Sequence, residues 1–335
     1  MRNTINTVNG EVGIDTLNYI MPHEHTLWLS EMPPPEKYAS VCDEAYENLL
    51  PIYKELVEKH NCNTVVDVST GYFIDIEQMR RLSKGSGMNI VLSTGWYVDN
   101  YTHAKREECY RPPFFRDNTA EVIAQAMIDE LTVGMKGKDV KAGIIKVGMA
   151  NLDHESDRKL LKAAAIAQKE TGASITTHTC KQSERQGTLD FLEGAGVDPG
   201  RLYLGHADCT NGFLDAGICE SLRLVKRGCN LLFTLWGITN ASLIGWSNTP
   251  LPKHLSAYIT TALVSEGYAD NILLSIDYRL HYTNKKINCE LYEIPERTPL
   301  YAFTYVVPQL KKLGVSQKDI NKIMNSNPKR MLLNS

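Results

Sequence analysis

The chain has 335 residues, of which 43% are hydrophobic and 22% are charged, and its formal net charge is −3. This composition is typical of a globular protein in solution and excludes a disordered or fibrous chain. The balanced charge and a sequence pI near 6.3 also argue against the broad basic surface of a nucleic-acid-binding protein, so we expect no nucleic-acid partner.

No stretch of the sequence approaches the roughly 18 consecutive apolar residues that a membrane-spanning helix needs. The polar segment Met1–Gly10 lacks the apolar core of a signal peptide. We therefore expect a cytoplasmic protein without membrane contact. The eight cysteines are scattered, with no zinc-ribbon spacing, and are expected to be reduced. No linker or repeat divides the chain, which favours a single domain over residues 1–335.

Apolar strand-like stretches alternate with helical segments along the chain, which is the pattern of β/α units around a parallel sheet. Eight strands can be counted, and eight is the number that closes a β/α barrel. We expect them around Tyr19–His25, Thr64–Thr70, Asn89–Gly95, Ala142–Gly148, Ala173–His178, Leu202–His206, Asn230–Leu235 and Ile272–Asp277. The predicted fold is therefore a single eight-stranded parallel β/α barrel.

Helices are predicted between these strands from the 3.6-residue apolar period. The expected segments are Asp43–His60, Ile74–Lys84, Thr119–Met135, Glu155–Thr171, Glu184–Glu193, Leu214–Arg227 and Leu255–Glu266, with extra C-terminal helices over Thr298–Leu313 and Ser316–Met324. Pro51 should shift the start of the first helix or kink its first turn. Two irregular stretches, Tyr97–Asn118 and Tyr278–Pro299, are expected to overhang the barrel mouth.

Six side chains that can bind metal stand at the ends of predicted strands. His23 and His25 are two residues apart on an extended segment, so both imidazoles point to the same side. The others each close a short apolar stretch and are Lys146, His178, His206 and Asp277. Residues at the C-terminal ends of barrel strands face the mouth where barrel enzymes have their active sites. We therefore predict that the six converge on a metal site.

Five motifs carry a family resemblance in their order and spacing. They are Met21-Pro-His-Glu-His25, Gly143-Ile-Ile-Lys146, Thr177-His-Thr179, Gly205-His-Ala-Asp208 and Leu273-Leu-Ser-Ile-Asp277. Over nearly its whole length the chain resembles the phosphotriesterase family of the amidohydrolase superfamily. The resemblance implies two divalent metal ions, usually zinc.

The resemblance also implies how the residues divide between the ions. His23, His25 and Asp277 would hold the more buried ion. His178 and His206 would hold the more exposed one. Lys146, carboxylated by carbon dioxide on its amine, would bridge both together with a hydroxide. An unmodified lysine would repel cations, whereas burial and nearby metal favour the neutral amine that can be carboxylated.

The chemistry of such a centre predicts two catalytic residues, Lys146 and Asp277. The ions lower the pKa of bound water from about 15.7 to roughly 7, so a hydroxide is available as nucleophile. Asp277 can take its proton and pass it to the leaving group. Glu24 points to the opposite face of the strand from the two histidines, so we expect it to support the site rather than to bind metal.

Substrate-binding residues are expected on the loops above the mouth. Gly95-Trp96-Tyr97 resembles a family element in which the tyrosine lies over the exposed metal; the alternative is an aromatic ring that fills the core. Basic residues there would suit a substrate phosphate or carboxylate, or would simply be solvated. The candidates are Arg279, Lys181, Arg185, Lys285 and Lys286.

Three functions are compatible with these residues. The preferred one is a lactonase or esterase acting on a small polar lactone, such as a phosphorylated sugar lactone, with incidental phosphotriesterase activity. The second is an amide hydrolase of N-acyl compounds. The third is a non-catalytic metal-binding barrel, which loss of ligands would indicate, whereas all six are present. The sequence leaves open the bond cleaved, the native metal and whether the chain forms a homodimer.

Overall fold

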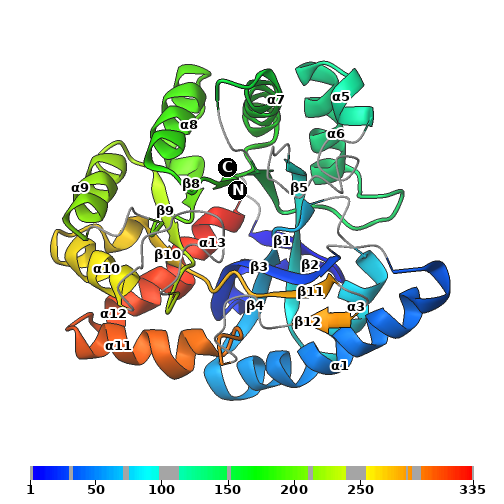
Figure 1. The fold of residues 1–335 in the computed structure, drawn as a ribbon, viewed down its shortest axis with the longest axis horizontal. Helices are drawn as coiled ribbons and strands as arrows, with labels where there is room; N and C mark the ends of the chain where they lie inside the picture. The colour runs from blue at the N-terminus through cyan, green and yellow to red at the C-terminus, as the bar shows by residue number, and fades with distance from the viewer. Residues whose placement is uncertain are drawn as a thin grey trace.

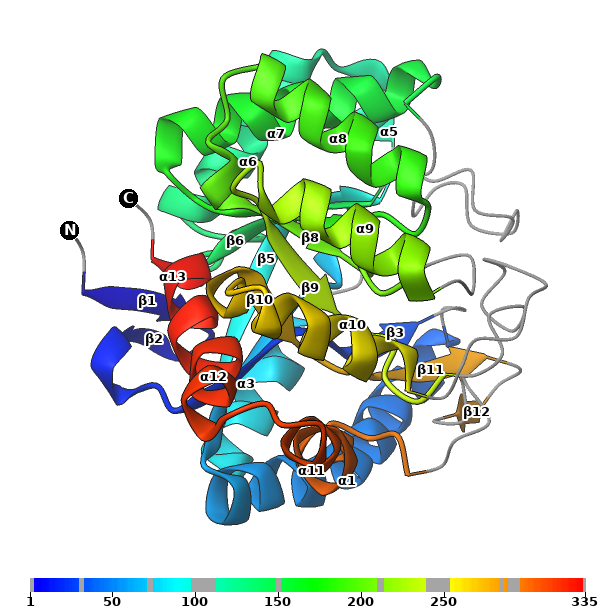
Figure 2. The same ribbon diagram turned by 90° about the vertical axis from the view of Figure 1, so that its left-hand side faces the viewer.

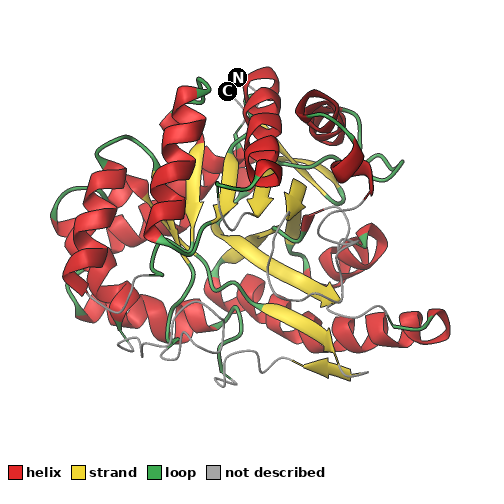
Figure 3. Cartoon of the chain, turned by 45° about the horizontal axis from the view of Figure 1, so that its top comes forward, coloured by secondary structure: helices red, strands yellow, loops and turns green. Residues whose placement is uncertain are grey.

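The computed structural model describes residues 3–29, 33–70, 75–97, 113–148, 152–209, 214–238, 254–283, 286–288 and 296–333. Within them, eight parallel strands lie at the centre and helices surround them (Figures 1 and 3). The strands are β3 (Tyr19–Leu29), β4 (Cys62–Asp67), β5 (Asn89–Tyr97), β6 (Ile144–Gly148), β7 (Ile175–His178), β8 (Leu202–Gly205), β9 (Asn230–Phe233) and β10 (Ile272–Leu274). Each pairs in parallel with the next along the chain. The predicted β/α barrel is confirmed.

The barrel closes where the chain leaves β10. The backbone N–H of Asp277 donates to the carbonyl of His23 at 3.2 Å. The chain then continues as β11 (Arg279–Thr283), which pairs in parallel with β3. A further strand, β12 (Lys286–Asn288), pairs with β11 in antiparallel fashion. Part of the stretch predicted to be irregular after the eighth strand is therefore sheet.

The helices predicted between strands are present, with shifted ends. They are α1 (Pro35–His60), α3 (Ile76–Ser86), α6 (Ala120–Thr132), α7 (Glu155–Thr171), α8 (Gln182–Gly194), α9 (Leu214–Val225) and α10 (Leu255–Ser265). A short helix, α5 (Pro113–Asp117), lies within the irregular stretch Tyr97–Asn118, of which residues 98–112 are outside the described residues. Single 3₁₀ turns cover Ile14–Thr16, Pro199–Arg201 and Ala269–Asn271.

Helix α1 begins eight residues before its predicted start, and Pro51 lies inside it. Pro35 occupies the first turn, where its fixed φ suits a helix and its missing N–H is not needed. The buried side chains of Val41, Cys42 and Ala45 extend the apolar face to the N-terminal side of Pro51. Packing against the barrel therefore outweighs the helix-breaking tendency of Pro51.

The C-terminal segment forms two helices that each contain a π-helical stretch, at the start of the first and in the middle of the second. The elements are the π-helix Ala302–Val306, α11 (Val307–Lys312), α12 (Gln317–Asn321), the π-helix Lys322–Ser326 and α13 (Asn327–Leu332). A proline, Pro308 or Pro328, follows each π-helix closely. Since proline lacks an N–H, the regular hydrogen-bond ladder cannot continue there, and the wider turn accommodates it.

An N-terminal hairpin that the sequence did not predict closes one end of the barrel. It consists of β1 (Thr4–Thr7) and β2 (Gly10–Gly13), joined by a turn at Val8-Asn9, and Gly10 directly after the turn has a φ of 108°. Ile5 packs with Ile144 and Leu232 of the barrel interior. In Figure 2 the hairpin and both termini lie at one end of the molecule, and β11 lies at the other. Because the hairpin covers one end of the barrel, the mouth lies at the other end, near β11.

No helix among the described residues is both long enough and apolar enough to cross a membrane.

Candidate active site

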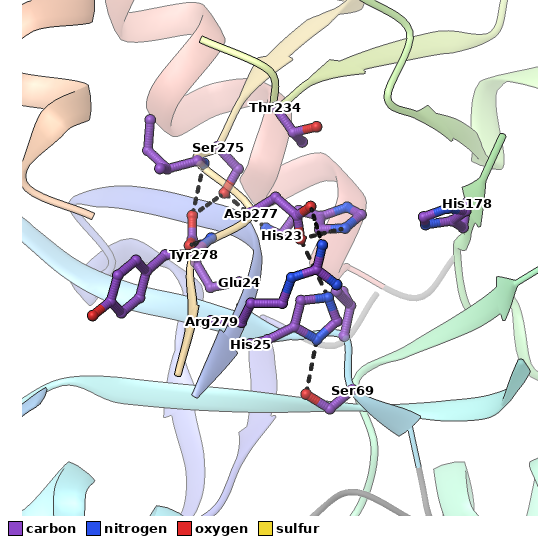
Figure 4. A network of polar contacts seen from close by, with 12 residues as sticks. His23, Glu24, His25, Ser69, His178, Thr234, Ser275, Asp277, Tyr278 and Arg279 are labelled. Carbon is purple, nitrogen blue, oxygen red and sulfur yellow. Dashed lines mark hydrogen bonds and ion pairs between the residues drawn. The ribbon is translucent and has the colours of Figure 1, made fainter. Parts of the chain in front are cut away.

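The predicted metal-binding side chains gather at the end of the barrel opposite the hairpin. His23, Lys146 and His206 have no exposed surface, and Asp277 is 2% exposed. His25 Nε2 lies 3.3 Å and His23 Nε2 lies 3.6 Å from Asp277 Oδ1 (Figure 4). The fold thus brings His23 and Asp277, which are 277 − 23 = 254 positions apart in the sequence, into contact with each other.

Neighbouring hydroxyl groups orient the rings of two of the histidines. His25 Nδ1 contacts the Ser69 hydroxyl at 2.9 Å, so Nε2 is the nitrogen that faces Asp277. His206 Nδ1 contacts the Thr234 hydroxyl at 2.6 Å, and its Nε2 lies 2.9 Å from a ring nitrogen of His178. Hydroxyl partners of this kind fix the ring orientation of metal-binding histidines.

His178 faces the cluster through its ring nitrogen Nδ1. Its Nδ1 lies 2.9 Å from His206 Nε2, whereas its Nε2 lies 3.3 Å from the Cys180 thiol. The two rings meet edge to face with centroids 4.4 Å apart. Two nitrogens so close, both turned inward, could ligate one cation together.

The unsatisfied atoms of the cluster fit a divalent cation. Among the described residues, none hydrogen bonds to Nδ1 of His23, and Nε2 of His23 and Oδ1 of Asp277 meet at 3.6 Å without a hydrogen bond of good geometry, although all three atoms are buried. Buried polar atoms are normally paired because leaving them unpaired is costly. One ligand atom each from His23, His206 and Asp277 lie within 4.8 Å of one another. This trio mixes the two ligand sets implied by the family resemblance, so the structure gathers the residues without dividing them into two sets.

The charge states suit metal binding as well. Burial, reinforced by the nearby Lys146, lowers the pKa of His23 well below its usual range, and burial lowers that of His206 to about 3. Burial alone would raise the pKa of Asp277, but the Arg279 guanidinium and the histidines hold it well below its usual value. Neutral imidazoles beside a carboxylate are the donor set that zinc and similar ions prefer.

Lys146 is a buried lysine that can lose its charge near neutral pH. Burial lowers the pKa of its amine to about 7, and Nζ donates to the Thr177 carbonyl at 3.0 Å. Strands β5 and β6 lie so close together at this residue that a Cβ on Gly95 would be 1.9 Å from the Lys146 carbonyl oxygen. Gly95 also has a φ of 121°, which other residues rarely adopt. A neutral amine is the form that can react with carbon dioxide.

Tyr97 lies against the cluster and is 7% exposed. Its ring centroid is 6.1 Å from that of His178 and 5.7 Å from Lys146 Nζ. Its hydroxyl donates to the Val68 carbonyl at 3.4 Å. The ring therefore packs on the candidate metal-binding residues, and its hydroxyl is directed towards the backbone after β4.

Two of the predicted basic residues are clearly placed. Arg279, on β11, is in register with His25, and its Nη2 lies 3.9 Å from Asp277 Oδ2; its side chain is 17% exposed. Lys181 is 70% exposed and lies 3.6 Å from Glu184 at the start of α8. Of the pair, Arg279 is the one that reaches the cluster.

The other basic candidates have different outcomes. Lys286 belongs to β12, and Lys285 lies outside the described residues. Arg185 was wrongly placed on a loop above the mouth: it lies one turn inside α8, is fully buried, and pairs with Glu220 at 2.7 and 2.8 Å. It also donates to the carbonyl of His206 at 3.3 Å. Arg185 lies on the inward face of α8, which its position shortly after a strand could not reveal. It therefore supports the rim of the barrel.

Several buried supports of the site were missed by sequence reasoning. Asp208 accepts from the backbone N–H groups of Thr234 and Leu235 at 3.1 and 2.7 Å. Asp67 accepts from the N–H groups of Thr26 and Ser69 at 2.8 and 2.9 Å. Asp208 could have been found from the sequence, since it ends the motif Gly205-His-Ala-Asp208. Nothing in the sequence pattern marked Asp67 as different from a residue that merely closes a strand.

Residues 3–332 match the family model described as the phosphotriesterase family. A phosphotriesterase-related protein of Nematostella vectensis is 28% identical, covering 92% of this chain and 84% of that protein. An N-acetyltaurine hydrolase of Tetraodon nigroviridis is 26% identical (98% and 97%), and an aryldialkylphosphatase of Saccharolobus solfataricus is 27% identical (94% and 94%). A mutant organophosphorus hydrolase from Deinococcus radiodurans superposes with a TM-score of 0.79 at 24% identity, covering 98% of this chain and 97% of that one.

Proposed function

The chain belongs to the phosphotriesterase family, and we propose that it hydrolyses a small polar lactone or ester that carries an anionic group. Members of this family are metal-dependent hydrolases. The observation that carries the proposal is the place of Arg279, a partly exposed guanidinium 3.9 Å from a carboxylate oxygen of the candidate metal cluster. A substrate held at the cluster would meet this positive charge.

Each residue of the cluster has a role in the proposed reaction. His23, His25, His178, His206 and Asp277, with Lys146 in carboxylated form, would hold two divalent ions, zinc being the expected metal. Such ions, when bound, supply a nucleophile from water near neutral pH and polarise the substrate carbonyl. Asp277, whose lowered pKa keeps it a carboxylate at neutral pH, accepts a proton and passes it to the leaving oxygen.

A second candidate is the hydrolysis of an N-acyl compound. It is favoured by the relatives named N-acetyltaurine hydrolase, five of which are 25–29% identical to this chain. The same residues could serve both reactions, because a lactone and an amide each present a planar carbonyl. An amine is the poorer leaving group, so the amide reaction depends more strongly on proton transfer from Asp277.

A substrate panel tests the proposal. The metal-loaded protein is assayed with neutral and phosphorylated lactones by release of acid. It is assayed with N-acyl amino acids and N-acyl aminosulfonates by release of amine, and with a chromogenic phosphotriester. We expect the highest kcat/KM on an anionic lactone and loss of activity after metal removal by a chelator. Highest kcat/KM on an N-acyl compound would establish the second candidate instead. Activity that survives complete metal removal would contradict both.

Replacing Arg279 tests the anionic substituent. Arg279→Met should raise KM for the anionic substrate about 10- to 100-fold, because a charge-assisted hydrogen bond contributes about 1.5–3 kcal/mol. Arg279 also lies 3.9 Å from the Asp277 carboxylate and lowers its pKa, so neutral substrates should lose some kcat, but their KM should change far less than that of the anionic substrate. Lys181→Met, at an exposed lysine, is the matched control. Equal losses on neutral and anionic substrates would show that Arg279 supports the structure of the site instead.

A further inference from the structure

The backbone at Asp277 adopts a conformation that its surroundings must hold in place. Its φ is 54°, in the left-handed region that residues other than glycine seldom occupy. The residue lies in the turn between β10 and β11, and its carboxylate has to meet His23 and His25 at 3.6 and 3.3 Å. A small rotation of the adjacent peptide groups would move that carboxylate away from both rings.

Glu24 holds the N–H groups on both sides of Asp277. Its carboxylate is 1% exposed; Oε1 accepts from the backbone of Ile276 at 2.8 Å, and Oε2 accepts from that of Tyr278 at 2.7 Å (Figure 4). Oε1 also accepts from the Ser275 hydroxyl at 2.6 Å, and this hydroxyl in turn accepts from the backbone N–H of His23 at 2.9 Å. One carboxylate therefore joins the turn to the strand that carries the two histidines.

Arg297 holds the carbonyl side of the same turn. Its side chain is buried, and Nη2 donates to the Ile276 carbonyl and, at 2.6 Å, to the Thr234 carbonyl. Nε donates to the Trp236 carbonyl at 3.0 Å. The Thr234 hydroxyl is the group that contacts His206 Nδ1. Arg297 therefore ties the turn of Asp277 to the residue that orients His206.

We infer that Glu24 and Arg297 are positioning residues for the metal centre and that together they fix Asp277 among the histidines. Glu24 binds the peptide N–H groups that flank Asp277, and Arg297 binds the peptide carbonyl that precedes it. Neither residue needs to touch metal or substrate. The inference rests on the proposed function, because it assigns these two residues to the metal-binding site proposed there.

The test uses two conservative substitutions, alone and combined. Glu24→Gln keeps the size of the side chain but turns an N–H₂ group towards one of the two backbone N–H groups. Arg297→Lys keeps the charge but cannot reach three carbonyls at once, because it lacks the planar fork of arginine. Zinc affinity is measured by competition with a chromogenic chelator, alongside the melting temperature of the metal-free protein and kcat and KM on the best substrate of the panel.

We expect each variant to bind zinc 10- to 100-fold more weakly and to lose kcat with little change in KM, as is usual when groups that orient metal ligands are altered. The double variant should lose less than the product of the two single effects, because both act on one turn. Substitution with cobalt adds a second readout, since the visible spectrum of bound cobalt changes when a ligand moves.

Two substitutions elsewhere are matched controls. Glu130→Gln alters a partly buried acid on α6 that accepts a hydrogen bond from Thr94, and Arg201→Lys alters an arginine that donates to the Gly172 and Leu333 carbonyls at 2.7 and 2.6 Å. They should lower the melting temperature without weakening zinc binding.

The possible results separate the inference from the proposed function. Site variants that bind zinc as tightly as the unaltered protein, or that lose no more affinity than the controls, would overturn the inference. An unaltered protein that binds no zinc or other divalent metal would overturn the proposed function, and the inference with it. If Arg297→Lys does not fold, Glu24→Gln and the milder Glu24→Asp decide the question.

Discussion

Lys146→Ala should abolish hydrolysis and strip the metal from the protein. The lysine is fully buried, its pKa is lowered to about 7, and its Nζ lies 5.7 Å from the centre of the Tyr97 ring that packs on His178, so we expect its carboxylated form to bridge two ions. Elemental analysis of protein purified without chelators should show a fall from about two ions per chain to fewer than one. Short carboxylic acids, which can occupy the space of the lost side chain, should restore part of the activity.

The control for this variant is Lys136→Ala, at an exposed lysine outside the cluster whose pKa desolvation also lowers. Its metal content and activity should match those of the unaltered protein. A Lys146→Ala protein that keeps two ions and its turnover would show that the lysine is not a bridging ligand. An unmodified Lys146 amine in a metal-loaded crystal structure would argue against the carboxylated form directly.

Asp277→Asn should reduce kcat by about 10²- to 10⁴-fold, which is the usual contribution of a positioned acid or base. Metal content should fall much less, because an amide oxygen still offers a weak ligand while it cannot carry a proton. Arg279 and the neighbouring histidines hold the pKa of Asp277 well below its usual range, so in the unaltered protein the carboxylate is charged throughout neutral pH, which is the form a proton acceptor must have. Steady-state kinetics and elemental analysis on the same sample measure both effects.

Two results would contradict the proton-transfer role of Asp277. Near-normal kcat in Asp277→Asn would show that another group moves the proton. Loss of metal as complete as in Lys146→Ala would show that Asp277 acts mainly as a ligand. Restored turnover on a substrate with a better leaving group, which needs less protonation, would agree with the predicted role.

The sequence by itself determined the barrel and the identity of the residues that gather at its mouth. Strand-length apolar stretches separated by amphipathic helices are compatible with few folds, and the eight parallel strands appear where they were predicted. His23, His178 and Asp277 could be assigned to one end because the C-terminal ends of parallel barrel strands always meet. The N-terminal hairpin was missed, although the dipeptide Asn9-Gly10 is a common sequence signal for one; in the structure the turn is Val8-Asn9 and Gly10 pairs with Thr7.

The tertiary structure alone decided what surrounds and supports those residues. Arg185 and Arg279 are both basic residues close behind a strand end, yet Arg185 is fully buried against Glu220 whereas Arg279 reaches the carboxylate of Asp277 in the candidate metal-binding cluster. Arg297 binds the carbonyl of Thr234, 63 residues earlier in the chain. Sequence pattern reflects local periodicity and strand ends, but a contact between a side chain and a distant peptide group depends on how helices and turns pack together. That packing fixes the orientation of each ligand, and with it the chemistry of the site.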